Sequence, residues 1–510
     1  MAEATPATAP RPLTRGRDNQ ASEGSSQRKL NGQFFTPASA ADAMVQAVGW
    51  PLDPAYPGGA LLDPCCGDGA YLAAAIRKVL ASGLSAGEQR AVIEERLWGW
   101  DIDPEALAAC RAALGALLTE AGLPGALPRI EHRDALDGLR PGERVAAVVT
   151  NPPYLEAKRM PDALKRRIKA ECPAAGRGAF DLYGAFVELA ARWADELCLL
   201  IPNRFLVVGY ADHLRRDLLA GWEIDVTDHS RDDLFADAQV YPIVLHARRS
   251  DRPRYRVAGA VAAPLGTMLP LAPDDLAGRS LFQRCMSSPD ARRFDDVADI
   301  RWTVSFHRAG LRDQFVFTDR PDSPHARRFL GGGRFAGNSE VDRYRIAWGG
   351  GWIDYDERRA LQARNGLPPL SVHESPKAVI CQNVRRARVA LDTEGLILKD
   401  TLLSMRLKAD QPAHLLPWLV LVLNSDLFHY LYEHAYAGTR KGGAYLHFLA
   451  RYIDPFPFPP APAPEVVDAL HARLVADPAR QPEAEAAVRA AWRVTAGEAQ
   501  ALDVYPLPRA

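Results

Sequence analysis

The chain has 510 residues, of which 47% are apolar and 25% charged, and 62 lysines and arginines balance 63 aspartates and glutamates to a net charge of −1. This composition is typical of a folded soluble protein and excludes disorder of the whole chain. At ~150 residues per domain, the length predicts roughly three folding units. Because the total charge is near neutral, any contact with nucleic acid must come from a local basic patch.

The seven cysteines are scattered and contain no C-x-x-C pair. This usage indicates reduced thiols in a cytoplasmic protein and predicts no metal site. No run of ~18 uncharged apolar residues is present, so no membrane span is expected. The first residues also lack the apolar segment of a secretory signal.

In chain order, residues 1–30 are rich in Ala, Pro, Thr, Ser and Arg and show no hydrophobic period, which predicts a flexible tail. From 31 to about 250, short apolar runs alternate with helical stretches, as in βα units on a parallel sheet. Strands are predicted at Ala60–Asp63, Leu97–Asp101, Arg129–His132, Val145–Thr150, Leu197–Ile201, Ile224–Val226 and Val240–His246. Helices are predicted between them at Ala70–Ser82, Pro104–Glu120, Leu182–Ala194 and Ala211–Ala220.

The second half is less regular. A stretch rich in Pro and Ala over 251–280 predicts a junction, and the last 45 or so residues, rich in Ala, Glu and Arg, predict helices. We therefore expect four parts: the tail at 1–30, an α/β domain at 31–265, a second domain at 266–460 and a helical extension at 461–510.

The segment Asp63–Gly69 follows a predicted strand and opens a helix. Gly67 and Gly69 allow a tight turn and close approach of a ligand to the backbone. The third glycine of a dinucleotide fingerprint and the lysine of a phosphate loop are both missing, so the loop suits a nucleoside without pyrophosphate. One βα unit later, Asp101 is placed to accept ribose hydroxyls and Ile102 to lie against the base. An ordinary helix start with Asp101 as a cap is the alternative.

The segment Asn151-Pro152-Pro153-Tyr154 follows a buried apolar run. Its two prolines stop the strand and stiffen the loop, so the Asn151 side chain and the Pro152 carbonyl are aimed at the carboxyl edge of the sheet. Two fixed acceptors suit a planar NH₂ group, whose nitrogen gains positive charge as it becomes a nucleophile. Tyr154 is placed to stack on the ring that carries this amine. A plain Pro-Pro turn is the alternative.

The order of these segments resembles that of the gamma class of DNA adenine-N6 methyltransferases of restriction–modification systems. The resemblance implies a seven-strand Rossmann-like S-adenosylmethionine-dependent methyltransferase fold with a C-terminal mixed α/β target-recognition domain. It also implies double-stranded DNA as partner, and it leaves open whether a separate cognate restriction endonuclease acts with the chain. The matching segments are GQFFTP at 32–37, DPCCGDG at 63–69, GWDID at 99–103, NPPY at 151–154, DLYGAF at 181–186, IPNRF at 201–205 and LFADA at 234–238.

The resemblance implies a set of S-adenosylmethionine-binding residues that border the cofactor and hold its methionine end, its ribose and its adenine. In chain order these are Phe35, Thr36, Pro37, Asp63, Pro64, Gly67, Gly69, Asp101, Ile102 and Asp134. Asp137 is an alternative to Asp134 for the amino group of the cofactor adenine. For the target, the resemblance implies that Asn151, Pro152 and Pro153 form the loop that binds the amine and that Tyr154 and Phe235 sandwich the extruded base.

DNA-contacting arginines are expected at Arg385, Arg386 and Arg388, at Arg440–Lys441, and in the basic stretch 155–172, which equally suits a solvated helix face. Other functions remain open. A cytosine-N4 enzyme has the same chemical needs, a protein glutamine methyltransferase also acts on a planar NH₂, and a catalytically idle DNA-binding subunit is a third possibility.

Overall fold

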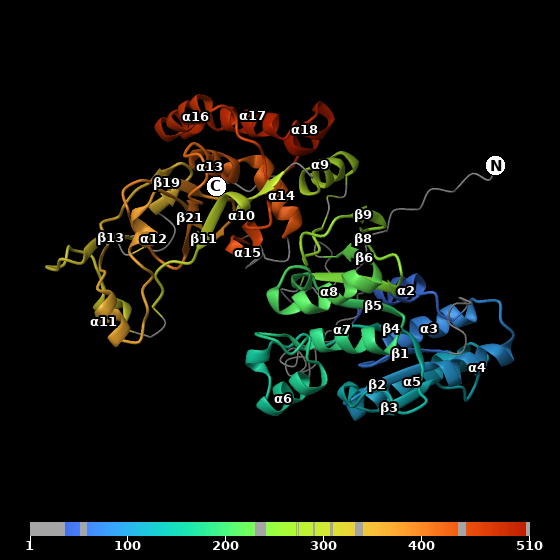
Figure 1. Cartoon of the computed structure of the whole chain (residues 1–510). Coiled ribbons are helices and arrows are strands. Elements are labelled where there is room, and N and C mark those ends of the chain that lie inside the picture. The colour runs from blue at the N-terminus through green and yellow to red at the C-terminus, as the bar shows by residue number, and fades with distance from the viewer. Residues whose placement is uncertain are drawn as a thin grey trace. The chain divides into compact units, whose positions relative to one another are not determined.

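The structure is a computed structural model that describes residues 36–51, 59–229, 241–271, 273, 275–288, 291–306, 310–331, 340–436 and 445–505. The chain divides into two compact units between Leu271 and Ala272 (Figure 1). This division falls a few residues after the domain boundary expected at 265.

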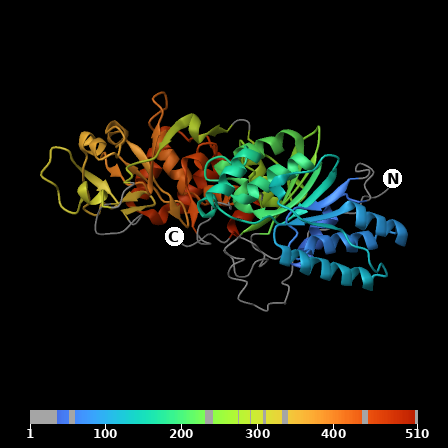
Figure 2. The same ribbon diagram turned by 90° about the horizontal axis from the view of Figure 1, so that it is seen from below.

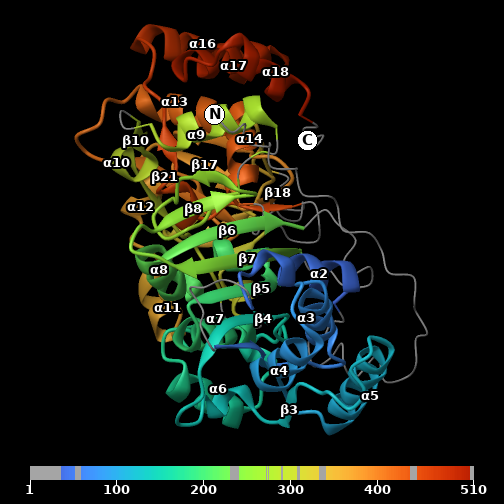
Figure 3. The same ribbon diagram turned by 90° about the vertical axis from the view of Figure 1, so that its right-hand side faces the viewer.

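A nine-stranded sheet forms the centre of the first unit, in the order β3-β2-β1-β4-β5-β7-β6-β8-β9 (Figure 3). Strands β1 to β5 are parallel, and β7 runs antiparallel between β5 and β6. Strands β8 and β9 extend the sheet beyond its predicted seven strands. The strands are β1 Ala60–Asp63, β2 Leu97–Asp101, β3 Arg129–His132, β4 Val145–Thr150, β5 Glu196–Pro202, β6 Trp222–Asp228, β7 Pro242–Arg249, β8 Arg254–Val257 and β9 Ala260–Ala262.

Helices cover both faces of this sheet, as Figure 2 shows with α3 to α5 in blue and α7 and α8 in green. Leu61, Ala147 and Cys198 join the core formed with α2 to α5. Because side chains alternate along a strand, the equally buried Leu62 and Val148 face the opposite layer, where α7 packs against β4 and β5. The helices are α2 Ala38–Ala47, α3 Ala70–Leu80, α4 Ala86–Arg96, α5 Pro104–Glu120, α6 Asp162–Glu171, α7 Leu182–Trp193 and α8 Asp212–Gly221.

The predicted bounds of β1 to β4 and of α5 agree with the structure to the residue. The prediction of a junction over 251–280 was wrong in part, since β8, β9 and the start of α9 (Leu276–Met286) lie in it. In β8, Tyr255 and Val257 are buried and alternate with more exposed arginines. This half-buried pattern makes a strand, although the surrounding composition is typical of a linker.

Within its described residues, the second unit contains two four-stranded sheets, with the orders β11-β21-β17-β19 and β12-β16-β13-β20, and three two-stranded ribbons. Its strands are β10 Arg292–Arg293, β11 Ala298–Arg301, β12 Val316–Phe317, β13 Ala326–Leu330, β14 Val341–Asp342, β15 Arg345–Ile346, β16 Trp352–Asp354, β17 Lys377–Cys381, β18 Asn383–Val384, β19 Val389–Asp392, β20 Ile397–Leu398, β21 Leu402–Leu407, β22 Leu446–His447 and β23 Pro457–Phe458. Besides α9, its helices are α10 Phe294–Val297, α11 Glu357–Gln362, α12 Ser371–Glu374, α13 Leu415–Asn424, α14 Asp426–Ala435, α15 Ala450–Ile453, α16 Pro464–Ala476, α17 Gln481–Ala491 and α18 Ala496–Asp503.

Helices α13 and α14 of this unit are both largely buried. Within the described ranges no single helix is long and apolar enough to cross a membrane. Among the described helices, α13 and α14 reach that length and apolar composition only when they are taken together, and they bend by 67° at their junction.

Candidate active site

The loop between β1 and α3 adopts a backbone conformation that requires glycine. Gly67 and Gly69 have φ angles of 52° and 92°, in the left-handed region. A Cβ atom on Gly69 would lie 2.6 Å from the Cys110 Sγ atom, whereas a Cβ atom on Gly67 would meet no atom within 4 Å. The glycine at 69 is therefore needed for packing, and the glycine at 67 leaves the backbone open to a ligand.

The end of β2 is joined to this loop through Asp101. Its Oδ2 atom accepts a hydrogen bond of 2.8 Å from the Gly67 N–H, and its Oδ1 atom accepts one of 2.9 Å from the Asp103 N–H. Each carboxylate oxygen has a second acceptor position. Asp101 can therefore accept hydroxyl groups from a ligand while it holds the loop.

A buried carboxylate lies at the end of β1. Asp63 Oδ1 accepts hydrogen bonds from the Thr150 hydroxyl at 2.7 Å and from the Cys65 N–H at 3.3 Å. Burial raises the pKa of Asp63 to about 7, although these two hydrogen bonds lower it. A cationic group next to Asp63 would offset the cost of ionising it there.

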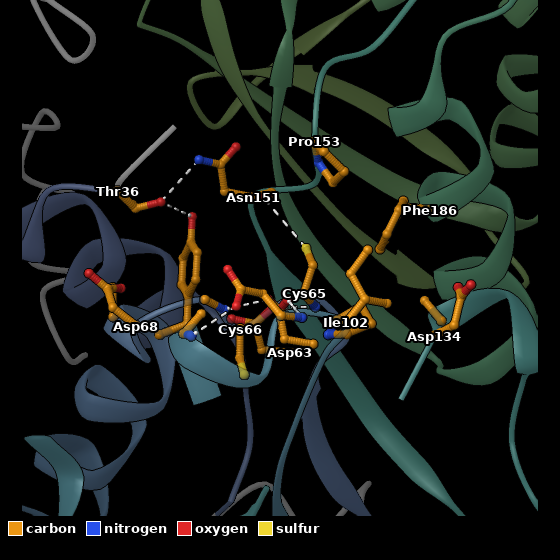
Figure 4. Close-up of a pocket in the computed structure, with 18 of the residues that line it drawn as sticks. Thr36, Asp63, Cys65, Cys66, Asp68, Ile102, Asp134, Asn151, Pro153 and Phe186 are labelled. Atoms are coloured by element: carbon orange, nitrogen blue, oxygen red, sulfur yellow. Dashed lines mark hydrogen bonds between the residues drawn. The ribbon is translucent and has the colours of Figure 1, made fainter. Parts of the chain in front are cut away.

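These loops enclose a cavity of about 410 Å³, a size in the range of ~300–1,000 Å³ that is usual for small-molecule sites. Figure 4 shows Thr36, Asp68 and Asn151 on one side of it and Ile102, Phe186 and Asp134 on the other. Ile102 lines the cavity and is 64% exposed, so its side chain is open to a ligand. The cavity is lined by Thr36, Asp63, Pro64, Cys65, Cys66, Gly67, Asp68, Ala70, Tyr71, Asp101, Ile102, Asp103, Glu105, Ala106, Ala109, Asp134, Ala135, Leu136, Asn151, Pro153, Leu164, Leu182 and Phe186.

The loop after β4 places the Asn151 carboxamide at this cavity. The Asn151 Nδ2 atom donates to the Thr36 hydroxyl at 3.1 Å, and the Oδ1 atom lies 2.8 Å from the Tyr154 hydroxyl, which donates to it. The same hydroxyl lies 2.9 Å from the Leu200 carbonyl oxygen of β5. Thr36 thus fixes one end of the carboxamide, and Tyr154 of the same loop fixes the other.

Tyr154 is held by its hydroxyl beside the cavity. Its ring makes an edge-to-face contact with Tyr183 at 6.2 Å, and burial raises the pKa of its phenol well above the ordinary value. The hydroxyl therefore stays protonated and donates. A ring anchored in this way has little freedom to turn.

The turn after β3 supplies a carboxylate at the other end of the cavity. Asp134 lines the cavity and Asp137 is not among its lining residues. Asp134 Oδ1 accepts from the Leu136 N–H at 2.9 Å, and Oδ2 accepts from Arg167 Nη1 at 2.6 Å. Of the two acids left open by the sequence, Asp134 is the one that a ligand would meet.

The structure brings most of the predicted site residues into one place. The predicted residues that line the cavity are Thr36, Asp63, Pro64, Gly67, Asp101, Ile102, Asp134, Asn151 and Pro153. The predicted residues Pro37, Gly69, Pro152 and Tyr154 do not line the cavity, although each is next to a lining residue in the chain. Phe35 and Phe235 lie outside the described residues.

Sequence reasoning missed the apolar wall on α7 and α6. Leu182 and Phe186 line the cavity from α7, and Leu164 lines it from α6. The spacing of four between Leu182 and Phe186 places them on one face of a helix, and this was a usable signal. Nothing in the sequence indicated which face of α6 meets the cavity.

The expected DNA-contacting arginines of the second unit differ in their surroundings. Arg385 is exposed, and its Cζ atom lies 5.6 Å from the centre of the exposed Tyr445 ring. Arg386 is bound to Asp426, and its burial lowers the pKa of its guanidinium to about 10. Arg385 is therefore available to a partner and Arg386 is not, while Arg440–Lys441 lies outside the described residues.

Three family profiles match different parts of the chain. They are N-6 DNA Methylase over residues 21–176, Eco57I restriction-modification methylase over 142–234 and TaqI-like C-terminal specificity domain over 335–458. Over these residues the chain matches the N-6 DNA methylases and the specificity domains of restriction–modification enzymes. The two methylase matches fall in the first unit and the specificity-domain match in the second.

A curated relative and two solved structures extend this result. The Type II methyltransferase M.TthHB8I of Thermus thermophilus is 27% identical over 206 residues, which are 38% of this chain and 41% of that protein. The Type IIL restriction-modification enzyme MmeI in complex with DNA has a TM-score of 0.54 and 14% identity, with 91% of this chain and 74% of that chain covered. A nuclease-deletion mutant of the Type ISP enzyme LlaGI has a TM-score of 0.51 and 12% identity, with coverage of 87% and 47%.

At these identities the solved structures show the fold alone, which this chain shares with these restriction–modification enzymes. The chain spans about two fifths of the length of its curated relative. Its fold class is thus the one that the sequence predicted.

Proposed function

We propose that this DNA methyltransferase transfers a methyl group from S-adenosylmethionine to N6 of an adenine that is flipped out of a specific double-stranded DNA site. The observation that supports this most strongly is the Asn151 carboxamide, held between Thr36 and Tyr154 at the wall of the cavity. A fixed carbonyl acceptor at that position suits an amine that must become tetrahedral.

The cavity suits this cofactor in size and in the order of its chemical groups. Asp63 offers a buried carboxylate for the ammonium group of the methionine end, and Asp101 offers acceptors for the ribose hydroxyls. Ile102 and Phe186 offer apolar contact for the adenine, and Asp134 offers an acceptor for its amino group. When bound, S-adenosylmethionine supplies an electrophilic methyl group on sulfur.

The chain would promote the reaction by position and by two acceptors. The target nitrogen forms its new bond to the methyl carbon as the bond from that carbon to sulfur breaks, and a proton leaves to solvent. Asn151 Oδ1 and the Pro152 carbonyl would accept both N–H groups of the amine while its nitrogen gains positive charge. Tyr154 and Phe235 would stack on the extruded base and return part of the cost of unstacking it.

The specificity-domain match in the second unit supports site-selective DNA binding. We propose Arg385 as one of the residues that contact DNA, because arginine can bind both guanine edges and phosphates. A separate endonuclease that cuts the unmodified site would complete the system. Cytosine N4 is the nearest alternative acceptor, since its NH₂ group has the same requirements.

Methylation of DNA in vitro tests the proposal. The purified chain is incubated with genomic DNA and labelled S-adenosylmethionine. One part of the DNA is then digested to nucleosides, and another part is kept intact and sequenced for modified bases. We expect label in N6-methyladenine at one sequence motif, and labelling that is ~10²–10³-fold slower with the variant Asn151→Ala. Label in N4-methylcytosine would show that the acceptor is cytosine N4 and not adenine N6. Label in protein instead of DNA would contradict the proposal.

A further inference from the structure

One arginine of α6 connects that helix to the cofactor cavity. Arg167 Nη1 donates to Asp134 Oδ2 at 2.6 Å, and Arg167 Nη2 donates to Asp137 Oδ1 at 2.5 Å. Both acids belong to the short turn after β3, where Asp134 is the N-cap of the 3₁₀ helix η1 (Ala135–Asp137) and Asp137 is its last residue. A single guanidinium therefore ties α6 to this turn.

Of the two acids that Arg167 binds, only one lines the cavity. Asp134 lines the cavity, together with Leu136 from the same turn and Leu164 from α6, whereas Asp137 is not among the lining residues. The Asp134 carboxylate receives the Leu136 N–H on one oxygen and Arg167 on the other. Its rotation is fixed by two donors from different elements, and each oxygen keeps an acceptor position that a ligand can use.

The contact is too exposed to be explained by stability. The side chains of Arg167, Asp134 and Asp137 are 37%, 36% and 59% exposed. Ion pairs with this exposure contribute little to folding, because water and salt screen them. The forked geometry of arginine does, however, set the direction of the carboxylates that it binds.

We infer that Arg167 is a positioning residue for the cofactor base: it orients Asp134 toward the purine amino group and holds α6 beside that end of the cavity. This inference rests on the proposed function, because it takes S-adenosylmethionine as the ligand. It adds a residue from the helix that follows the Asn151–Tyr154 loop to the determinants of cofactor affinity. Arg167 acts through Asp134 and touches no reacting atom.

Binding of S-adenosylhomocysteine, measured by calorimetry, tests the inference without turnover. Arg167→Ala should weaken binding by about two- to fivefold and leave the melting temperature nearly unchanged. Arg167→Lys should recover part of the affinity, because lysine keeps the charge and loses the fork. Arg166→Ala is the matched control, since Arg166 is exposed on the same helix and is not a lining residue.

A double-mutant cycle separates positioning from a direct effect. Asp137 is not a lining residue, so Asp137→Asn should weaken binding only through Arg167. We expect it to reduce affinity in the wild-type chain and to have no effect in the Arg167→Ala background. Equal effects in the two backgrounds would overturn the inference.

An analogue of S-adenosylhomocysteine that carries hydrogen in place of the purine amino group completes the test. If Arg167 orients Asp134 toward that amino group, the penalty of Arg167→Ala should disappear with the analogue. An unchanged penalty, or normal S-adenosylhomocysteine affinity in Arg167→Ala, would refute the inference. If the wild-type chain itself failed to bind S-adenosylhomocysteine, the proposed function would fail instead.

Discussion

Lowering the pH from 7.5 to 6 should weaken S-adenosylmethionine binding, because a proton competes with the cofactor's ammonium group for Asp63. The Asp63 carboxyl is buried at the end of β1, and burial raises its pKa to about 7. The ammonium group can bind only the ionised carboxylate, so binding must displace the proton wherever one is present. An α-amino group has a pKa of ~7.7–8.0, so the ligand itself stays mostly charged over this pH range.

The size of the effect follows from the pKa. With a single competing proton, the apparent dissociation constant is multiplied by 1 + 10^(pKa − pH), which gives about an eightfold increase between pH 7.5 and pH 6.

The folding stability of the free protein changes with pH in the opposite direction to cofactor affinity. The folded chain holds this proton more tightly than an unfolded aspartate with the ordinary pKa of 3.8 does, so the group lowers the stability of the free protein as the pH rises from about 4 to 7. The cofactor-induced rise in melting temperature should therefore be larger at pH 7.5 than at pH 6.

Calorimetric titrations at several pH values provide the assay. Methylthioadenosine, which lacks the amino acid, is the matched ligand, and its affinity should not fall at low pH. Asp63→Asn keeps the shape of the side chain and should bind the cofactor weakly with little pH dependence. A flat wild-type profile, or the same slope for both ligands, would show that Asp63 does not hold the ammonium group.

Three further substitutions test other parts of the site. Asn151→Ala should lower kcat by ~10²–10³, by analogy with the loss of one oxyanion-hole donor, with little change in cofactor or DNA affinity; an unchanged single-turnover rate would remove the basis of the mechanism. Asp101→Ala should weaken cofactor binding by about 1.5–3 kcal/mol. A normal affinity by calorimetry would show that Asp101 does not bind the ribose. Arg385→Ala should weaken DNA binding and lower its salt dependence by about one counterion. The control Tyr445→Phe keeps the ring and should change neither. Equal salt slopes for Arg385→Ala and the wild-type chain would exclude a contact between Arg385 and a phosphate.

The sequence predicted the parts of the fold that depend on local signals. Strands β1, β2 and β4 are buried and mostly apolar, and they end at Asp63, at Asp101 and at Thr150 directly before Asn151, where a loop turns and polar side chains appear. Since the carboxyl ends of parallel strands share one edge, the sequence could also place Asp63, Asp101 and Asn151 near one another. Local pattern and tertiary structure agree at these positions.

Contacts between elements distant in sequence could not be predicted in this way. Arg167 binds two acids, Asp134 and Asp137, that lie 33 and 30 residues earlier in the chain. The neighbouring Arg166 and Lys169 belong to the same basic stretch, and nothing in the sequence distinguishes them from Arg167. The same is true of Arg385 and Arg386, which are adjacent in the chain while only one is bound inside the unit. Such choices depend on which way each side chain faces after the elements have packed.

The place of β7 in the sheet has a consequence for how the first unit folds. Because β7 lies between β5 and β6 and pairs antiparallel with both, neither of those strands has its final neighbour until residues 242–249 have been synthesised. Until then β5 and β6 each present an unpaired edge, a template for pairing with other chains. Fragments that stop before β7 should therefore aggregate, even though they contain every described residue that lines the cavity.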